Sequence, residues 1–179
     1  MDDSPSGRSE SSVSPESSES TDLEGSDEPV VRRYEPGDEA AIRDVFERAM
    51  REAGTDPADI PGTRDLKWVE AAYVETGGEF LVVEVGGEIV ACGGLGVDGD
   101  VAELFRVAVD PTHQREGHGS RLLEALETAA RDRGAERVVL TTAGRQKSAV
   151  AFYPKHGYEQ TGIDRDGEYR LRHFAKRLE

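Results

Sequence analysis

The most informative segment of the chain reads Gln114-Arg115-Glu116-Gly117-His118-Gly119-Ser120. An apolar run at residues 101–109 precedes it, and leucines and alanines at helical spacing follow it, so the segment joins a strand to a helix. Its two glycines let the backbone approach a ligand closely, and the new helix presents unpaired N–H groups and the positive end of its dipole. The spacing fits neither a Walker loop nor the GxGxxG fingerprint. The segment predicts an anion site suited to a pyrophosphate.

Outward from this segment, apolar periodicity predicts a mixed α/β sheet in the order β-α-α-β-β-β-α-β-α-β-β, with about seven strands flanked by about four helices. The expected strands are residues 30–34, 80–85, 88–97, 101–109 and 137–142, with two more between 158 and 178. The expected helices are one that begins at the capping residue Asp38, then residues 66–74, 122–130 and 148–153. A helical crossover joins the central strands.

The chain has 179 residues, enough for one domain with its own core. Residues 1–29 hold nine acids and ten serines with almost nothing apolar, which predicts a disordered tail ahead of a domain at 30–179. The formal net charge is −15. Phosphate neutralisation needs a basic face, so this charge argues against a general nucleic-acid binder.

Only four of the 22 basic residues are lysines. An acidic, lysine-poor surface suits a salt-rich cytoplasm, where screening removes self-repulsion, although biased codon usage gives the same ratio. The sequence has no run of 18 apolar residues and no apolar signal core, which predicts a cytoplasmic protein with no membrane partner. The single cysteine, Cys92, is expected in the core. His113 and His118 stand five residues apart across a turn, a poor metal geometry, so no metal site is expected.

Two segments resemble the GCN5-related N-acetyltransferase (GNAT) superfamily. Residues 114–120 resemble its acetyl-CoA signature, [Gln/Arg]-x-x-Gly-x-[Gly/Ala], and follow a strand that ends Val-Ala-Val-Asp-Pro, as in that family. Residues 149–158, Ala-Val-Ala-Phe-Tyr-Pro-Lys-His-Gly-Tyr, resemble its A-x-x-[Phe/Leu]-Tyr-x-x-x-Gly-[Phe/Tyr] segment. The resemblance covers residues 30–178. It implies the GNAT fold, splayed at strands 4 and 5, and direct transfer of an acetyl group from acetyl-CoA to an amine.

The resemblance also implies where acetyl-CoA lies. Backbone groups of the strand end would pair with the pantetheine arm, and N–H groups from Arg115 to Ser120 would hold the pyrophosphate. The strand-end residues meant here are Val107, Ala108 and Val109. Two residues depart from the family: Glu116 puts an acid near the phosphates, and Gln146 replaces an Asn that commonly contacts the cofactor.

Direct transfer needs a neutral amine, a fixed N–H for the developing oxyanion and a proton donor for the leaving thiolate. A bulge in the fourth strand can supply the N–H of Val107. Tyr153 occupies the position of the family's general-acid tyrosine. The alternative is that Tyr153 is an aromatic packing partner beside Phe152.

Glu103 is the candidate base. Strict alternation along residues 101–109 makes it the lone acid on an apolar face that also carries Phe105, Val107 and Val109, so we expect a raised pKa and proton transfer through a water. The alternative is an orienting or surface carboxylate paired with Arg106.

The function expected from these residues is acetyl-CoA-dependent N-acetylation of a primary amine. Two alternatives stay open: an acetyltransferase of protein N-termini or lysines, and a non-catalytic acyl-CoA-binding sensor in which Tyr153 and Glu103 only pack. Residues 54–62, the second helix and the C-terminal strands are expected to shape the acceptor site. Both a monomer and a homodimer are compatible with the sequence.

Overall fold

The structure, a computed structural model, describes residues 28–59 and 63–179. The predicted tail therefore lies almost wholly outside the described residues. The strands are β1 (Val30–Arg33), β2 (Glu79–Val85), β3 (Glu88–Asp98), β4 (Val101–Val109), β5 (Arg137–Ala143), β6 (Glu159–Asp166) and β7 (Tyr169–Arg177). The helices are α1 (Glu39–Glu52), α2 (His118–Asp132) and α3 (Lys147–Lys155). In the part of the chain described, no helix is both long and apolar enough to cross a membrane.

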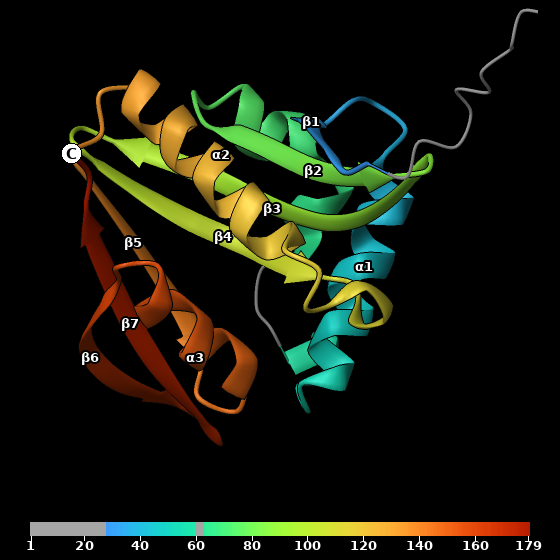
Figure 1. The fold of residues 1–179 in the computed structure, drawn as a ribbon. Helices are drawn as coiled ribbons and strands as arrows, with labels where there is room; N and C mark the ends of the chain where they lie inside the picture. Colours follow the sequence, from blue (N-terminus) through green and yellow to red (C-terminus); the bar gives the residue numbers. More distant parts are fainter. Residues whose placement is uncertain (1–27, 60–62) are drawn as a thin grey trace, which may run out of the picture.

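The seven strands form one mixed sheet in the order β1-β2-β3-β4-β5-β7-β6 (Figure 1). β4 and β5 run parallel, and α2 crosses over between them, as the sequence predicted. Their pairing extends only from Val101, opposite Arg137, to Leu104, opposite Leu140. β4 continues to Val109 without this partner, so the two strands part and the predicted splay is confirmed.

Two separate cores fill the two faces of the sheet, with α2 on one face and α1 on the other (Figure 1). The α2 core contains the leucines that gave this helix its sequence periodicity, packed on alternate residues of β2, β3 and β4. The α1 core contains the stripe Ile42, Val45 and Phe46, packed on the intervening residues of the same strands, among them the buried Cys92. The pleat of the strands thus assigns successive residues to different cores.

The alternation of β4 breaks at Arg106, which has a φ of +59°. Cys92 of β3 lies opposite Ala108 and Gly94 lies opposite Phe105, so two residues of β4 face the single Gly93. This is a β-bulge, and it corrects the predicted face of the strand. Leu104 and Val107 both belong to the α2 side, whereas Phe105 and Ala108 belong to the α1 side. Glu103 therefore does not share a face with Val107 and Val109.

The predicted second helix at residues 66–74 is instead two short turns. One is a 3₁₀ turn, Thr63–Lys67, and the other is a π turn, Glu70–Val74. The wide turn carries Tyr73 onto Phe80, with ring centroids 5.0 Å apart, and its hydroxyl bonds to Asp65 of the preceding turn. Tertiary packing of one aromatic residue thus overrides the regular helix that local spacing favours.

Asp38 precedes α1 but does not cap it with its side chain. Its carboxylate instead accepts the N–H of Glu35 and forms an ion pair with Arg32 of β1 at 2.8 Å. Glu39 accepts the N–H of Gly37 at 2.9 Å. The predicted start of the helix is right, but the predicted cap is wrong because β1 supplies a stronger partner.

We predict that Gly94→Ala destabilises the fold by about 1–3 kcal/mol, whereas Gly96→Ala on the same strand changes stability by less than about 0.5 kcal/mol. A Cβ at Gly94 would lie 2.6 Å from the packed ring of Tyr73, but one at Gly96 would lie 3.4 Å from the half-exposed ring of Phe105. Urea unfolding of both variants measures the difference, and equal losses would contradict this account of the α1 core.

Candidate active site

A cavity of about 270 Å³ opens where β4 and β5 part. It brings together four of the residues singled out from the sequence: Glu103, Val107, Gln146 and Tyr153. Ala108 and Val109 belong to the same strand end, but Ala108 is buried against α1 and Val109 packs on the α2 side. The residues 114–120 do not line this cavity; they form a second feature at the start of α2.

Glu103 projects from β4 into the cavity and is partly buried. Burial raises the pKa of its carboxyl group, and the charge of His173 on β7 acts in the opposite direction. Arg106, which one interpretation of the sequence paired with Glu103, contacts residues on the α1 side of the sheet. It donates from Nε to Asp65 at 3.2 Å and lies over the ring of Phe46.

Tyr153 is on α3 and is only 5% exposed. Its ring contacts Phe152, Tyr158 and Phe174, with centroids 5.2, 5.5 and 6.0 Å away. Within the described residues its hydroxyl has no hydrogen-bond partner, although the side chain lines the cavity. Burial raises the pKa of this phenol, so it keeps its proton at neutral pH. The ring is packed, as expected if Tyr153 is an aromatic packing partner. The hydroxyl faces no competing acceptor among the described residues, as a general acid requires.

Gln146 lies at the start of α3 and also lines the cavity. Its side-chain oxygen accepts the hydroxyl of Thr142 at 3.2 Å, and its amide nitrogen lies 3.2 Å from the sulfur of Met50. Both ends of the amide are therefore engaged by this chain. A cofactor contact from Gln146 would have to displace one of them.

The loop before α2 presents backbone donors, as its glycines predicted. Gly117 precedes the helix with a φ of +87°, and the N–H of Arg121 bonds to its carbonyl at 3.1 Å. The N–H groups of the first helical residues, His118 to Ser120, have no acceptor within the helix. An added Cβ at Gly117 would meet nothing within 4 Å, so its backbone angle, and not crowding, requires glycine.

α3 connects the loop before α2 to the cavity. The hydroxyl of Ser120 lies 2.9 Å from Nε2 of His156, whose Nδ1 lies 3.0 Å from the carbonyl of Phe152. These two hydrogen bonds connect the start of α2 to the C-terminal end of α3. Phe152 contacts Gly119, and the next residue, Tyr153, lines the cavity.

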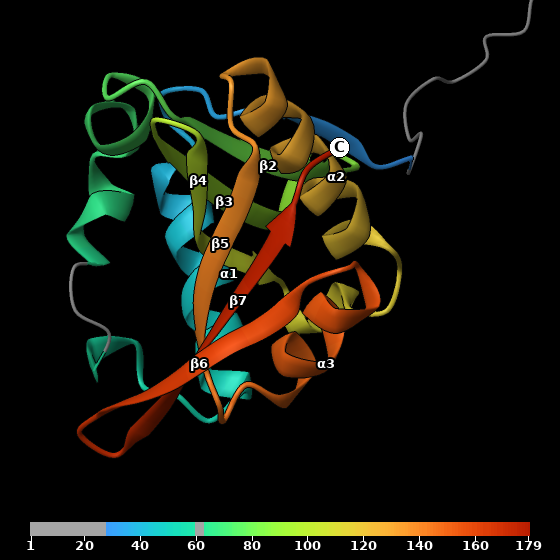
Figure 2. The same ribbon diagram turned by 90° about the vertical axis from the view of Figure 1, so that its left-hand side faces the viewer.

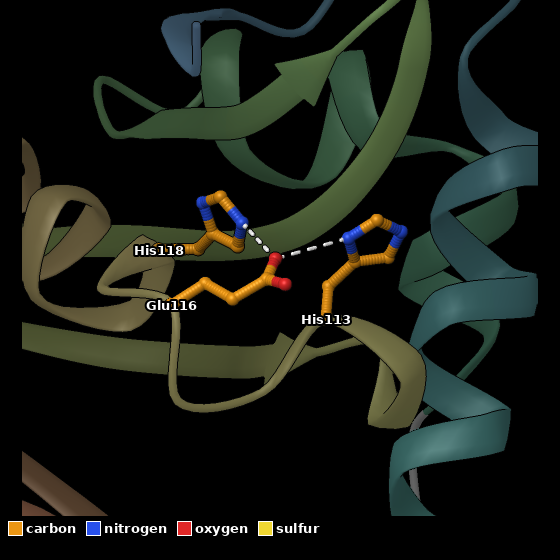
Figure 3. Close-up of side chains that lie close together, drawn as sticks. All are labelled: His113, Glu116 and His118. Carbon is orange, nitrogen blue, oxygen red and sulfur yellow. Dashed lines mark hydrogen bonds and ion pairs between the residues drawn. The ribbon is translucent and has the colours of Figure 1, made fainter. Parts of the chain in front are cut away.

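The side chains of the loop also converge, which the sequence did not predict. Glu116 turns back between two histidines, with one carboxylate oxygen 3.0 Å from Nε2 of His118 and 3.3 Å from Nδ1 of His113 (Figure 3). The hydrogen bond from His118, with that from His113, lowers the pKa of Glu116. The rings of His113 and His118, which the sequence placed apart across a turn, have centroids 6.0 Å from each other, because positive φ angles at Arg115 and Gly117 fold the loop back.

Sequence reasoning missed much of the cavity wall. Phe46 and Met50 come from α1, and Asp166 and Tyr169 come from either side of the β6–β7 turn, which extends away from the body of the domain (Figure 2). Thr55 lies in the loop expected to shape the acceptor site; it is 3% exposed, and its hydroxyl has no partner among the described residues. These residues carry no local motif, and only the tertiary fold brings them to β4.

We predict that the Glu103 carboxyl group titrates above the ordinary glutamate value of about 4.3. His173→Gln should raise this pKa further, because it removes the charge that acts against the effect of burial on Glu103. A ¹³C NMR titration of the side-chain carboxyl carbon measures both values, and His156→Gln, at the C-terminal end of α3 beside Ser120, is the matched control. A Glu103 pKa that His173→Gln leaves unmoved would contradict the placement of these two groups.

Residues 40–158 match the model of the acetyltransferase (GNAT) family. The chain is 36% identical over 135 residues to an IAA acetyltransferase of Azospirillum brasilense, which covers 74% of this chain and 86% of that protein. It is 32% identical over 115 residues to N-acetyltransferase 8 of Homo sapiens, which covers 60% of this chain. The chain spans about half the length of that human relative, at 51%.

Solved structures agree with this assignment. An acetyltransferase of the GNAT family from Staphylococcus aureus superposes with a TM-score of 0.75 at 18% identity, over 85% of this chain and 100% of that one. The structure of yncA from Salmonella typhimurium, solved with its cofactor acetyl-CoA, gives a TM-score of 0.68 at 23% identity, over 84% of this chain and 94% of that one. The fold expected from the two sequence segments is confirmed. This chain therefore belongs to the GNAT family of acetyltransferases and is an N-acetyltransferase.

Proposed function

We propose that the protein transfers the acetyl group of acetyl-CoA directly to a neutral primary amine bound in the cavity between β4 and β5. The observation that carries this proposal is the joint placement of Glu103 and Tyr153 in one cavity at the strand splay, beside a helix start with unpaired N–H groups. Relatives that are acetyltransferases, and a structural neighbour solved with acetyl-CoA, support it.

The residues present fit the pyrophosphate and the pantetheine arm of acetyl-CoA. The N–H groups of His118 to Ser120 suit the pyrophosphate, and β4 beyond Leu104 has an open edge on its β5 side for the pantetheine arm. When bound, acetyl-CoA supplies an activated thioester. Glu116 is the one acid in the loop, but the cradle is made of backbone groups that do not depend on side chains.

Glu103 handles the amine proton in this proposal. A free alkylamine has a pKa of about 10 and is protonated at neutral pH, so attack on the thioester requires loss of a proton. The carboxylate attracts the ammonium form into the cavity and accepts its proton through a water. The pKa that burial raises brings Glu103 closer to the operating pH, which favours a general base.

Val107 and Tyr153 serve the other two needs of the reaction. The bulge at Arg106 sets Val107 at the point where β4 leaves β5, and its N–H stabilises the oxyanion. Tyr153 donates its hydroxyl proton toward the sulfur as the C–S bond breaks and the C–N bond forms. The buried, protonated phenol is suited to this because it has no competing partner among the described residues.

The proposal is tested with a panel of small primary amines and peptides, measured as acetyl-CoA-dependent release of free thiol and as a mass increase of the acceptor. We expect amines to be acetylated faster than peptides, because the cavity has a volume of only about 270 Å³. Acetylation of peptides alone would instead favour a protein substrate. Tight acetyl-CoA binding without thiol release by any amine would favour the sensor alternative.

We predict that Gly117→Val weakens acetyl-CoA binding at least tenfold in calorimetry. The substitution forces a β-branched residue into a φ of +87° and moves the N–H groups of the cradle. Gly87→Val is the matched control, because Gly87 has the same φ, +87°, and equally open surroundings in the β2–β3 turn. Both variants should lose similar stability. Equal acetyl-CoA affinity for the two would place the pyrophosphate elsewhere.

We predict that Tyr153→Phe preserves acetyl-CoA affinity and lowers kcat by about 100-fold, the loss typical of a general acid. The ring and its contacts to Tyr158 and Phe174 remain, so the fold should be unchanged. Rapid-quench measurement of the acetyl-transfer step isolates this effect from product release. If the Tyr153→Phe variant has the wild-type rate of acetyl transfer, Tyr153 has only a packing role.

We predict that Glu103→Gln lowers kcat/KM most at neutral pH and recovers in part at high pH, where the amine loses its proton without help. In the parent, kcat/KM should rise with pH along a limb that reports the raised Glu103 pKa. Profiles over the same pH range for both proteins provide the comparison. A loss by the same factor at every pH would identify Glu103 as a residue that orients the acceptor instead.

A further inference from the structure

We propose that His113, Glu116 and His118 form a binding site for one divalent transition-metal ion of the Zn²⁺ class (Figure 3). Their ligand atoms are two imidazole nitrogens and one carboxylate oxygen, and all lie within 4.8 Å of one another. None of the three residues lines the cavity between β4 and β5. The test uses metal alone, so it is independent of the acetyl-transfer proposal.

The ligand triangle is close to the size that a tetrahedral ion requires. Bonds of about 2.0–2.1 Å to the metal place neighbouring ligand atoms about 3.3 Å apart. The shared oxygen of Glu116 already lies 3.0 Å from Nε2 of His118 and 3.3 Å from Nδ1 of His113. Only the edge between the two nitrogens must close, by rotation of partly exposed His113 about its side-chain bonds.

The donor set selects the class of ion. Two imidazoles and one carboxylate suit Zn²⁺, Co²⁺, Ni²⁺ and Cu²⁺, whereas Mg²⁺ and Ca²⁺ prefer oxygen ligands throughout. Three protein ligands leave a fourth position for water. The arrangement leaves room for it, because the Glu116 side chain is 52% exposed and faces solvent beside the buried His118.

The backbone holds the three ligands in place. His113 is the last residue of a short 3₁₀ turn, Pro111–His113. Asp110 caps this turn, and its carboxylate accepts the N–H of Thr112 at 2.9 Å. His118 is the first residue of α2 and is only 4% exposed. Glu116 stands between two residues with positive φ, Arg115 at +66° and Gly117 at +87°, which turn it back toward both rings. The backbone therefore sets the two Glu116–histidine edges of the ligand triangle before any ion arrives.

The surroundings of His118 set the expected strength of binding. Metal-bound histidines usually donate their other ring N–H to an acceptor, and loss of that partner costs about 10- to 100-fold in affinity. Nδ1 of His118 is buried and has no partner among the described residues. We therefore expect a dissociation constant of about 1–10 µM for Zn²⁺, weaker than that of a four-ligand structural zinc site.

The experiment uses the full chain without an added histidine tag, freed of metal with a chelator and then dialysed. Calorimetric titration with ZnCl₂ should show one ion bound per chain. Titration with Co²⁺ should produce the visible absorption bands of a four-coordinate ion. Zn²⁺ should also raise the melting temperature, because an ion that binds only the folded state stabilises it.

His113→Gln and Glu116→Gln should each weaken Zn²⁺ binding at least tenfold. Both side chains are partly exposed, so these variants should fold even if a change at buried His118 does not. His173→Gln is the matched control: it removes a histidine that also bonds to a carboxylate, Asp164, at 2.7 Å, but that belongs to no group of three ligands within residues 28–59 and 63–179. Its Zn²⁺ affinity should match that of the parent.

Two results would overturn the proposal. One is the absence of Zn²⁺ binding below about 1 mM, which would leave the three side chains as a hydrogen-bonded brace for the loop. The other is binding that survives both His113→Gln and Glu116→Gln, which would place the ion elsewhere on the acidic surface.

Discussion

The extra residue in β4 is the constraint on which the rest of the sheet depends. Arg106 has a φ of +59°, a conformation that costs about 1–2 kcal/mol for a side chain other than glycine. Two contacts from the α1 side offset this cost: the ion pair with Asp65, and the stacking of the guanidinium 5.6 Å from the centre of the Phe46 ring. The bend that results lets β4 end its pairing with β5 at Leu104 and still serve both cores.

Much of the fold could be predicted from the sequence because its signals are local. The stripes of α1 and α2, the turn glycines and the alternating strands each fixed an element without reference to the others. The second helix was wrong because Tyr73 is held by Asp65 and Phe80, neither of which its own periodicity reveals. The face of Glu103 relative to Val107 was wrong because alternation assumes one residue for each step of the strand, and a bulge breaks that assumption.

Part of the candidate site could likewise be predicted from the sequence, and part of it could not. The helix start at Gly117 was predictable, since glycine spacing and a following helix suffice to specify backbone donors. The cavity wall was not, because Met50 and Tyr169 reach it from elements more than a hundred residues apart. The approach of Glu116 to its two histidines also escaped prediction, because it depends on the backbone angles of a loop and not on the residue types alone.

The bulge also bears on how β4 changes in evolution. A codon gained within a regular strand turns every later side chain to the opposite face, and selection removes most such insertions. Here the bulge absorbs the additional residue, so Phe105 and Val107 face the two helices as they would in an uninterrupted strand without Arg106. Loss of that codon would leave both cores filled. It would remove the ion pair with Asp65 and straighten the strand beside β5, so the extra residue serves the opening between the strands and not the filling of the interior.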